Sequence, residues 1–139
     1  MAQEDQEFRR TDPVSNQVIG ACIEVHRALG PGLLESAYEA CLARELSLRG
    51  VAVRRQVPLA IEYKGELVDC AYRIDLLVSD SVVVELKSID QLLPIHLAQV
   101  LTYLKLSGHR IGLLVNFNVP ALRRGLRRLT LPPPESLTF

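Results

Sequence analysis

The sequence predicts a mixed α/β protein, in which one sheet of parallel and antiparallel strands carries helices on both sides. Two observations indicate this class. Runs rich in β-branched residues and bounded by turn residues lie between two helical segments on one side and one helical segment on the other. A short apolar run, residues 111–116, then follows the last helical segment, as expected for a right-handed strand–helix–strand crossover between parallel strands.

Length and composition are those of one globular domain. The 139 residues are 48% hydrophobic and 23% charged, and the formal net charge is zero. This balance argues mildly against non-specific DNA binding as the main role, because such proteins are usually basic. The three cysteines are far apart in sequence, which indicates reduced thiols packed as small apolar side chains and a cytoplasmic location. We expect no membrane segment and no signal peptide.

The helical segments near the N-terminus have clear boundaries. After a charged lead-in, residues 1–14, a helix capped by Ser15 or Asn16 should run to about residue 29. The sequence Gly30-Pro31-Gly32 should end it, since glycine provides a left-handed turn and proline stops continuation. A second helix is expected at about residues 33–49.

The remaining elements complete one domain, residues 15–131. Strands are expected at about residues 51–63, 67–78, 82–87 and 111–116, and a helix at 94–107. The segment 121–131 permits a helix or a helix followed by an edge strand. A tail, residues 132–139, begins with three prolines.

The central feature is a predicted hairpin, residues 73–88, with Ser79-Asp80-Ser81 at its tip. A three-residue tip pairs Val78 with Val82 and places Asp75 opposite Glu85, whereas a two-residue tip would separate the two carboxylates onto opposite faces. The predicted register gives one face with Asp75, Leu77, Val83, Glu85 and Lys87, and another with Ile74, Leu76, Val78, Val82, Val84 and Leu86.

Two carboxylates and a lysine on one face of apolar strands need a physical explanation, because burying an unpaired charge is costly. A hard divalent cation would satisfy Asp75 and Glu85, since Mg²⁺ is commonly held by one or two carboxylates with substrate phosphate and water. Lys87 would then orient an attacking water or steady a phosphate. The alternative is a buried ion network without chemistry, and the hairpin alone does not decide between them.

Four motifs, in order along the chain, resemble those of a known family. Gly32-x-x-Glu35-x-x-Tyr38 resembles the motif that names the GxxExxY proteins, which belong to the PD-(D/E)XK nuclease-like superfamily. Asp75 and Glu85-x-Lys87 follow in the superfamily's order, and Gln99-x-x-x-Tyr103 is similar to the Gln-x-x-x-Tyr of its RecB-like branch. The resemblance covers roughly residues 18–131. Ile74 stands where the common form has proline, a variation usual in the superfamily.

This resemblance implies a restriction-endonuclease-like α-β-β-β-α-β core and hydrolysis of phosphodiester bonds, with DNA as the expected substrate and Mg²⁺ or Mn²⁺ as the cofactor. It implies that Asp75, Glu85 and the main-chain carbonyl of Leu86 hold the metal. Glu35 would be a further ligand or a base just outside the ligands. Its place near the positive end of a helix favours a carboxylate in any case. Lys87 would orient the water or stabilise the developing charge.

The helix at 94–107 and the arginine-rich end supply the implied substrate contacts. Gln99 and Tyr103 would orient the scissile phosphate or support Lys87. His96 has a position that looks typical of the family, but a histidine that begins a helix explains it equally well. Arg123 and Arg124 could follow a nucleic-acid backbone, although such charges are more often a solvated face.

Two function classes remain. The first is an active nuclease, which the complete set of Asp75, Glu85 and Lys87 favours. The second is a non-catalytic nucleic-acid-binding or protein-interaction module that keeps the nuclease fold, which the neutral charge and small size favour. A small mixed sheet exposes its edge strands, which can pair with another chain. A homodimer or a partner protein is therefore plausible for either function class.

Overall fold

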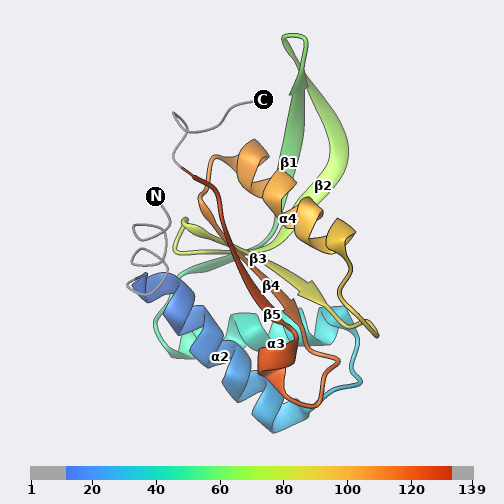
Figure 1. Cartoon of the computed structure of the whole chain (residues 1–139). Helices are drawn as coiled ribbons and strands as arrows, with labels where there is room; N and C mark the ends of the chain where they lie inside the picture. Colours follow the sequence, from blue (N-terminus) through green and yellow to red (C-terminus); the bar gives the residue numbers. More distant parts are fainter. Residues whose placement is uncertain (1–11, 133–139) are drawn as a thin grey trace.

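A computed structural model describes residues 12–132 (Figure 1). The elements are, in order, α2 (Pro13–Leu29), α3 (Glu35–Leu48), β1 (Val53–Tyr63), β2 (Glu66–Val78), β3 (Val82–Lys87), α4 (Pro94–Ser107), β4 (Ile111–Asn116), the 3₁₀ helix η1 (Leu122–Arg124) and β5 (Leu126–Thr130). The five strands form one sheet in the order β1-β2-β3-β4-β5. Among the strands of residues 12–132, only β3 and β4 are parallel neighbours, so the predicted mixed sheet, crossover and α-β-β-β-α-β core are confirmed.

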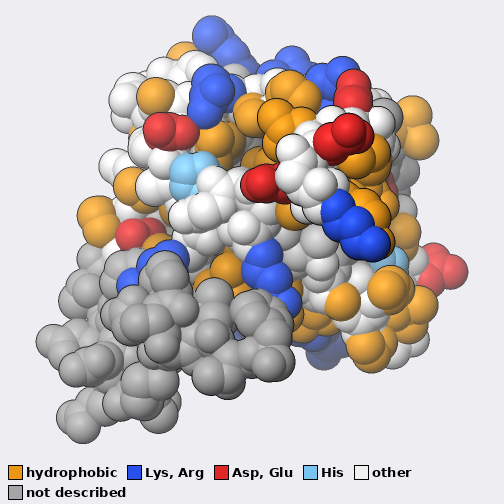
Figure 2. Space-filling view, turned by 90° about the horizontal axis from the view of Figure 1, so that it is seen from above, with side chains coloured by type: hydrophobic (Ala, Val, Ile, Leu, Met, Phe, Trp, Pro, Cys, Tyr) orange, Lys and Arg blue, Asp and Glu red, His pale blue; other side chains and the backbone are white. Residues whose placement is uncertain are grey.

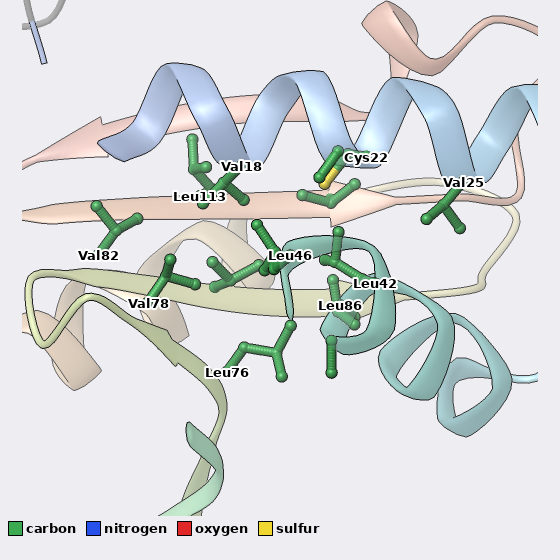
Figure 3. Packing of buried hydrophobic residues seen from close by; sticks show 14 of the residues in the cluster. Val18, Cys22, Val25, Leu42, Leu46, Leu76, Val78, Val82, Leu86 and Leu113 are labelled. Carbon is green, nitrogen blue, oxygen red and sulfur yellow. The ribbon is translucent and has the colours of Figure 1, made fainter. Parts of the chain in front are cut away.

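Helices cover both faces of the sheet, as predicted (Figure 1). Helices α2 and α3 lie on one face and α4 lies on the other. The larger core fills the space between α2, α3 and the sheet, where apolar side chains of the two helices meet those of β2, β3 and β4 (Figure 3). A smaller core joins α4 to the opposite face through Leu59, Ile74, Leu77, Val83, Tyr103 and Leu104. These two cores fix β3 from both sides.

The register of the β2–β3 hairpin is as predicted. Val78 pairs with Val82 and Leu76 with Val84 around a three-residue tip. Continued by one residue, this register places Asp75 opposite Glu85. The predicted face of Ile74 is wrong, because Ile74 packs into the α4 core. The alternation of side chains between the two faces of β2 is interrupted near Ile74. On the neighbouring strand β1, Gln56 has a positive φ of 52° at this level.

The ends of the chain differ from the predicted boundaries. The first helix begins at Pro13, so the lead-in predicted for residues 1–14 is too long. Asp12 is the N-cap, since its carboxylate accepts the backbone N–H of Ser15 at 2.6 Å, and proline suits the first helical turn. The final segment forms η1 and an edge strand. The rest of the predicted lead-in and nearly all of the predicted tail lie outside the described residues.

The cysteines are free, but they are not all packed as predicted. Cys22 is buried, and burial raises the pKa of its thiol to about 12. Cys41 is half-buried and Cys70 is exposed on the β1–β2 hairpin, so the prediction was wrong for Cys70. Within residues 12–132, no helix combines the length and the apolar character needed to cross a membrane.

Candidate active site

The candidate site lies at the open end of the β2–β3 hairpin, away from its tip. The paired residues of the two strands end at Leu76 and Val84. Beyond them, the carboxylate of Asp75 accepts the backbone N–H of Leu86 at 2.9 Å. A side chain thus satisfies a strand N–H at this end, and it holds the Asp75 carboxylate beside β3.

Glu85 is the most unusual residue of the site, since it is a carboxyl group that is only 5% exposed. Its Oε1 atom has no hydrogen-bond partner in the described part of the chain. Burial above all raises the pKa of Glu85 to about 9. A hydrogen bond with Asp75 and the charges of Asp75 and Glu35 act in the same direction, and Lys87 opposes them. Glu85 is therefore protonated at neutral pH in the metal-free protein.

Lys87 lies beside Glu85 without being tightly paired to it. Its Nζ atom is 3.9 Å from Oε2 of Glu85, which is the outer range of an ion pair. The Lys87 backbone is fixed, because its carbonyl accepts the N–H of Phe117 at 3.0 Å. A cation on a fixed backbone, with a side chain that is not locked, can reach a water or a phosphate next to the carboxyl groups.

Tyr38, the last residue of the Gly32-x-x-Glu35-x-x-Tyr38 motif, holds the loop before α3 in place. Its ring stacks on Phe117, with centroids 4.4 Å apart and planes 8° apart. Its hydroxyl donates to the carbonyl of Gly30 at 2.5 Å and accepts the N–H of Leu33 at 3.2 Å. Gly32, with φ of 102°, provides the left-handed turn between these contacts. Tyr38 therefore fixes where α3 begins.

Glu35, the first residue of α3, is thereby brought to the end of β3. Its Oε1 accepts the N–H of Ser88 at 3.4 Å, and the Ser88 hydroxyl donates to the carbonyl of Leu33 at 2.5 Å. These contacts join the start of α3 to the residue after Lys87. The Gly32-x-x-Glu35-x-x-Tyr38 motif thus has a physical role, which is to hold a carboxylate near Glu85.

Gln56 and Glu39 also belong to the site, although neither was predicted from the sequence as a site residue. The Gln56 amide donates to Oε1 of Glu39 at 2.5 Å and to Oδ1 of Asp75 at 3.3 Å. Glu39 is buried, and Arg55 donates two N–H groups to its Oε2 at 2.9 and 3.1 Å. A cavity of about 450 Å³ opens here, lined by Glu35, Ser36, Glu39, Gln56 and Asp75. The signal for Gln56 is its place opposite Asp75, which requires the β1–β2 register.

Helix α4 brings the predicted pair of neutral donors to the same region. The Gln99 amide donates to the hydroxyl of Tyr103 at 3.0 Å. Burial raises the pKa of Tyr103, and the charge of Glu85 raises it further. Tyr103 is thus a neutral phenol near the carboxyl groups. Because its oxygen accepts from Gln99, its own hydrogen is directed toward another acceptor.

The other predicted substrate contacts are less closely tied to the carboxyl groups. His96 lies in the first turn of α4, where its Nδ1 accepts the N–H of Leu93 at 2.8 Å. This explains His96 as a helix-start residue and leaves its Nε2 as the ring nitrogen that can donate a hydrogen bond. Arg123 and Arg124 are exposed on η1, which packs against α2. Their contact with nucleic acid stays a prediction.

The donor set fits a divalent cation that keeps part of its water shell. Among residues 12–132, no three His, Cys, Asp or Glu side chains converge to form a complete metal cage. Asp75 nevertheless lies close enough to raise the pKa of Glu85, and Glu85 has a buried oxygen without a hydrogen-bond partner in the described part of the chain. Two carboxylates completed by water and substrate phosphate are the usual environment of Mg²⁺.

Comparison with known proteins identifies the family of the chain. The family model described as the PD-(D/E)XK nuclease superfamily matches residues 12–129, from the N-cap of α2 into β5. No curated protein and no solved structure matches the chain. The matched range contains every candidate residue from Glu35 to Tyr103. The chain therefore belongs to the PD-(D/E)XK nuclease superfamily.

Proposed function

We propose that this protein is a nuclease that hydrolyses phosphodiester bonds, with Mg²⁺ or Mn²⁺ as its cofactor and DNA as its expected substrate. The supporting observation is the buried Glu85 carboxyl next to Asp75 and Lys87, with one oxygen that has no hydrogen-bond partner within residues 12–132. We also assign the chain to the GxxExxY proteins and to the RecB-like branch, on the motifs of residues 32–38 and 99–103. One domain, predicted for residues 15–131, is proposed to carry the activity.

The side chains would divide the chemistry between them. Asp75, Glu85 and the carbonyl of Leu86 would hold the metal, with Glu35 as a further ligand or a base beside it. When bound, the metal supplies positive charge for the phosphoryl and leaving oxygens and acidifies a bound water. Glu85 would release its proton on becoming a ligand, so metal binding is expected to be favoured by higher pH.

The remaining residues would act on the phosphate and the water. Lys87 would orient the attacking water or stabilise the charge that develops on the phosphate. Tyr103 would donate its hydroxyl hydrogen to a non-bridging oxygen, because Gln99 already occupies its acceptor side. Positioned donors of this kind need no reorganisation at the moment of reaction.

The surface charge suggests that the electrostatic attraction between this protein and nucleic acid is modest. Lys and Arg side chains lie among Asp and Glu side chains on the face seen in Figure 2, and the net charge is zero. A homodimer or a partner protein that adds binding surface therefore stays part of this proposal. The cytoplasmic location also stays a prediction.

Incubation of the protein with single-stranded DNA, duplex DNA and RNA, in Mg²⁺, in Mn²⁺ and in EDTA, tests the nuclease. We expect cutting only with metal, and a loss on the order of 100-fold or more in Asp75→Ala and Lys87→Ala. Asp80→Ala is the matched control. It removes an exposed carboxylate from the tip of the same hairpin, where Asp80 pairs with Arg54 at 3.0 Å, and it should keep full activity.

The alternative function, a non-catalytic module, predicts no metal-dependent cutting. A folded protein that binds nucleic acid or a protein, but neither cuts nor binds metal, would be a non-catalytic module that retains the nuclease fold. In that case Asp75→Ala and Asp80→Ala should behave alike. Circular dichroism of each variant separates loss of activity from loss of fold.

A further inference from the structure

A second cavity, of about 420 Å³, lies between the β1–β2 hairpin and α4, outside the carboxyl groups. Its size is within the range of small-molecule sites. The hairpin contributes Ile61 and Tyr72, and α4 contributes Ile95, His96, Gln99 and Tyr103, among others. The cavity therefore combines apolar walls and aromatic rings with three other polar side chains, His96, Gln99 and Thr102. This composition is typical of a site for a flat heteroaromatic group.

Tyr72 is the main exposed ring of this cavity. It is 43% exposed, although it packs edge-on against the buried Tyr103 with ring centroids 6.1 Å apart at 61°. The contact holds the Tyr72 ring in place and leaves much of it accessible. A fixed, accessible aromatic ring is the group on which unpaired nucleobases stack.

The polar groups of the cavity can contact the edge of a base. His96 accepts the N–H of Leu93 through Nδ1, so its Nε2 carries the hydrogen as a donor. Gln99 uses its amide nitrogen on Tyr103, so its amide oxygen is the acceptor that remains for a ligand. One donor and one acceptor suit the mixed hydrogen-bonding edges of nucleobases.

Tyr103 connects this cavity to the carboxyl groups. It lines the cavity, and it packs in the smaller core with Leu77 and Val83, which share strand faces with Asp75 and Glu85. A phosphate that accepts the Tyr103 hydroxyl would thus lie between the carboxyl groups and the cavity. The base attached to that nucleotide is the nearest group that could fill the cavity.

We propose that this cavity, walled by Tyr72 and Tyr103, binds an unstacked nucleobase next to the scissile phosphate, so that the enzyme selects single-stranded over duplex nucleic acid. The inference rests on the proposed nuclease function for the position of the phosphate. A base paired and stacked within a duplex cannot enter the cavity without leaving its stack. Single-stranded regions, frayed ends and gaps offer such bases directly.

Binding without cleavage tests this proposal in the Lys87→Ala protein with Mg²⁺ present. The probes are a fluorescent oligothymidylate of about 12 nucleotides and a blunt duplex of the same length. We expect the single strand to bind at least tenfold more tightly than the duplex. Adding Tyr72→Ala should weaken single-strand binding by roughly tenfold, since stacking on one ring contributes a factor of about five or more. Tyr72→Phe should preserve it.

Tyr63→Ala is the matched control, because Tyr63 is a tyrosine on the same hairpin, is 62% exposed and does not line the cavity. Its effect should stay within about twofold. Equal effects of Tyr72→Ala and Tyr63→Ala, or equal binding of duplex and single strand, would overturn the proposal even if the wild type cuts DNA. Tyr72-dependent binding by a wild type that cuts nothing would instead support the cavity and reject the nuclease.

Discussion

The two ends of the β2–β3 hairpin use the same two strands for opposite purposes. Next to the tip, Val78 pairs with Val82, and both side chains are fully buried in the larger core (Figure 3). At the open end, Asp75 and Glu85 crowd together, and a buried oxygen of Glu85 has no partner within the described residues. Gln56, beside them, has a positive φ.

The difference shows where the fold gains stability and where it loses it. Burial of branched side chains between two helical layers stabilises the hairpin near its tip. The open end opposes folding through a desolvated carboxyl, neighbouring negative charges and an unfavourable backbone conformation. Because rigid strands connect the two ends, the well-packed end can hold the unfavourable groups in place. Such local cost is expected where chemistry needs fixed charges.

The largest expected difference is between substitutions at two sequence neighbours, Leu76 in the core and Asp75 in the candidate site. Leu76 is fully buried, so Leu76→Ala should lower the free energy of unfolding by about 2–5 kcal/mol. Asp75→Asn keeps an oxygen that can accept the Leu86 N–H and removes a negative charge beside Glu85. It should change the free energy of unfolding by less than about 1 kcal/mol while removing activity. Urea unfolding of the two variants measures both free energies.

The comparison would fail if Asp75→Asn destabilised the protein as much as Leu76→Ala. The carboxylate would then be a structural ion-network member, which is the alternative that the sequence left open.

A pH series on Glu85→Gln tests the cost of the buried carboxyl itself. The pKa of Glu85 is raised from 4.5 to about 9, so between these values the folded state holds a proton that the unfolded state has lost. The stabilising effect of this proton is complete below pH 4.5 and declines as pH rises toward 9. The free energy of unfolding should therefore fall with pH by up to about 1.4 kcal/mol per unit. Glu85→Gln should remove this part of the slope.

The result has a direct counterpart in metal binding. Metal that binds Glu85 replaces the proton, so Mg²⁺ should stabilise the wild type more at pH 8–9 than at pH 6, by differential scanning fluorimetry. Glu85→Gln should show little Mg²⁺ effect at any pH. A Glu85→Gln protein with the same pH slope as the wild type would mean that another group titrates.

Local patterns predicted those parts of the fold that local physics decides. Alternating apolar residues and a three-residue tip fixed the register of Val78 with Val82, and the residues that flank α4 marked its ends at Pro94 and Gly108. The same register predicted that the carboxyl groups of Asp75 and Glu85 lie opposite each other. The start of α2 was missed because Asp12-Pro13 suits a loop as well as a helix cap.

What the sequence did not reveal depends on pairing between distant segments. Gln56 faces Asp75 only through the β1–β2 register, which shifts between Leu59 and Ala60 without any local signal. From the sequence alone Glu39 is a helical carboxylate, and its part in the site depends on the strand that brings Gln56 and Arg55 beside it. The cavity beside Tyr72 likewise exists only where the long hairpin meets α4.

The smallest expected effect isolates the backbone conformation of Gln56. Gln56→Gly and Gln56→Ala both lose the contacts to Glu39 and Asp75, so their difference reports the conformation at φ of 52°. Glycine adopts this region freely, whereas a residue with a Cβ is disfavoured by about 1 kcal/mol. Gln56→Gly should therefore be more stable than Gln56→Ala by about 1 kcal/mol in urea unfolding.

The same pair of substitutions at Arg54, whose φ is not positive, should give the reverse order, because glycine normally weakens a strand. If alanine were the more stable residue at both positions, the open end of the hairpin would carry no backbone cost, and the contrast between its two ends would rest on Glu85 and its neighbours alone.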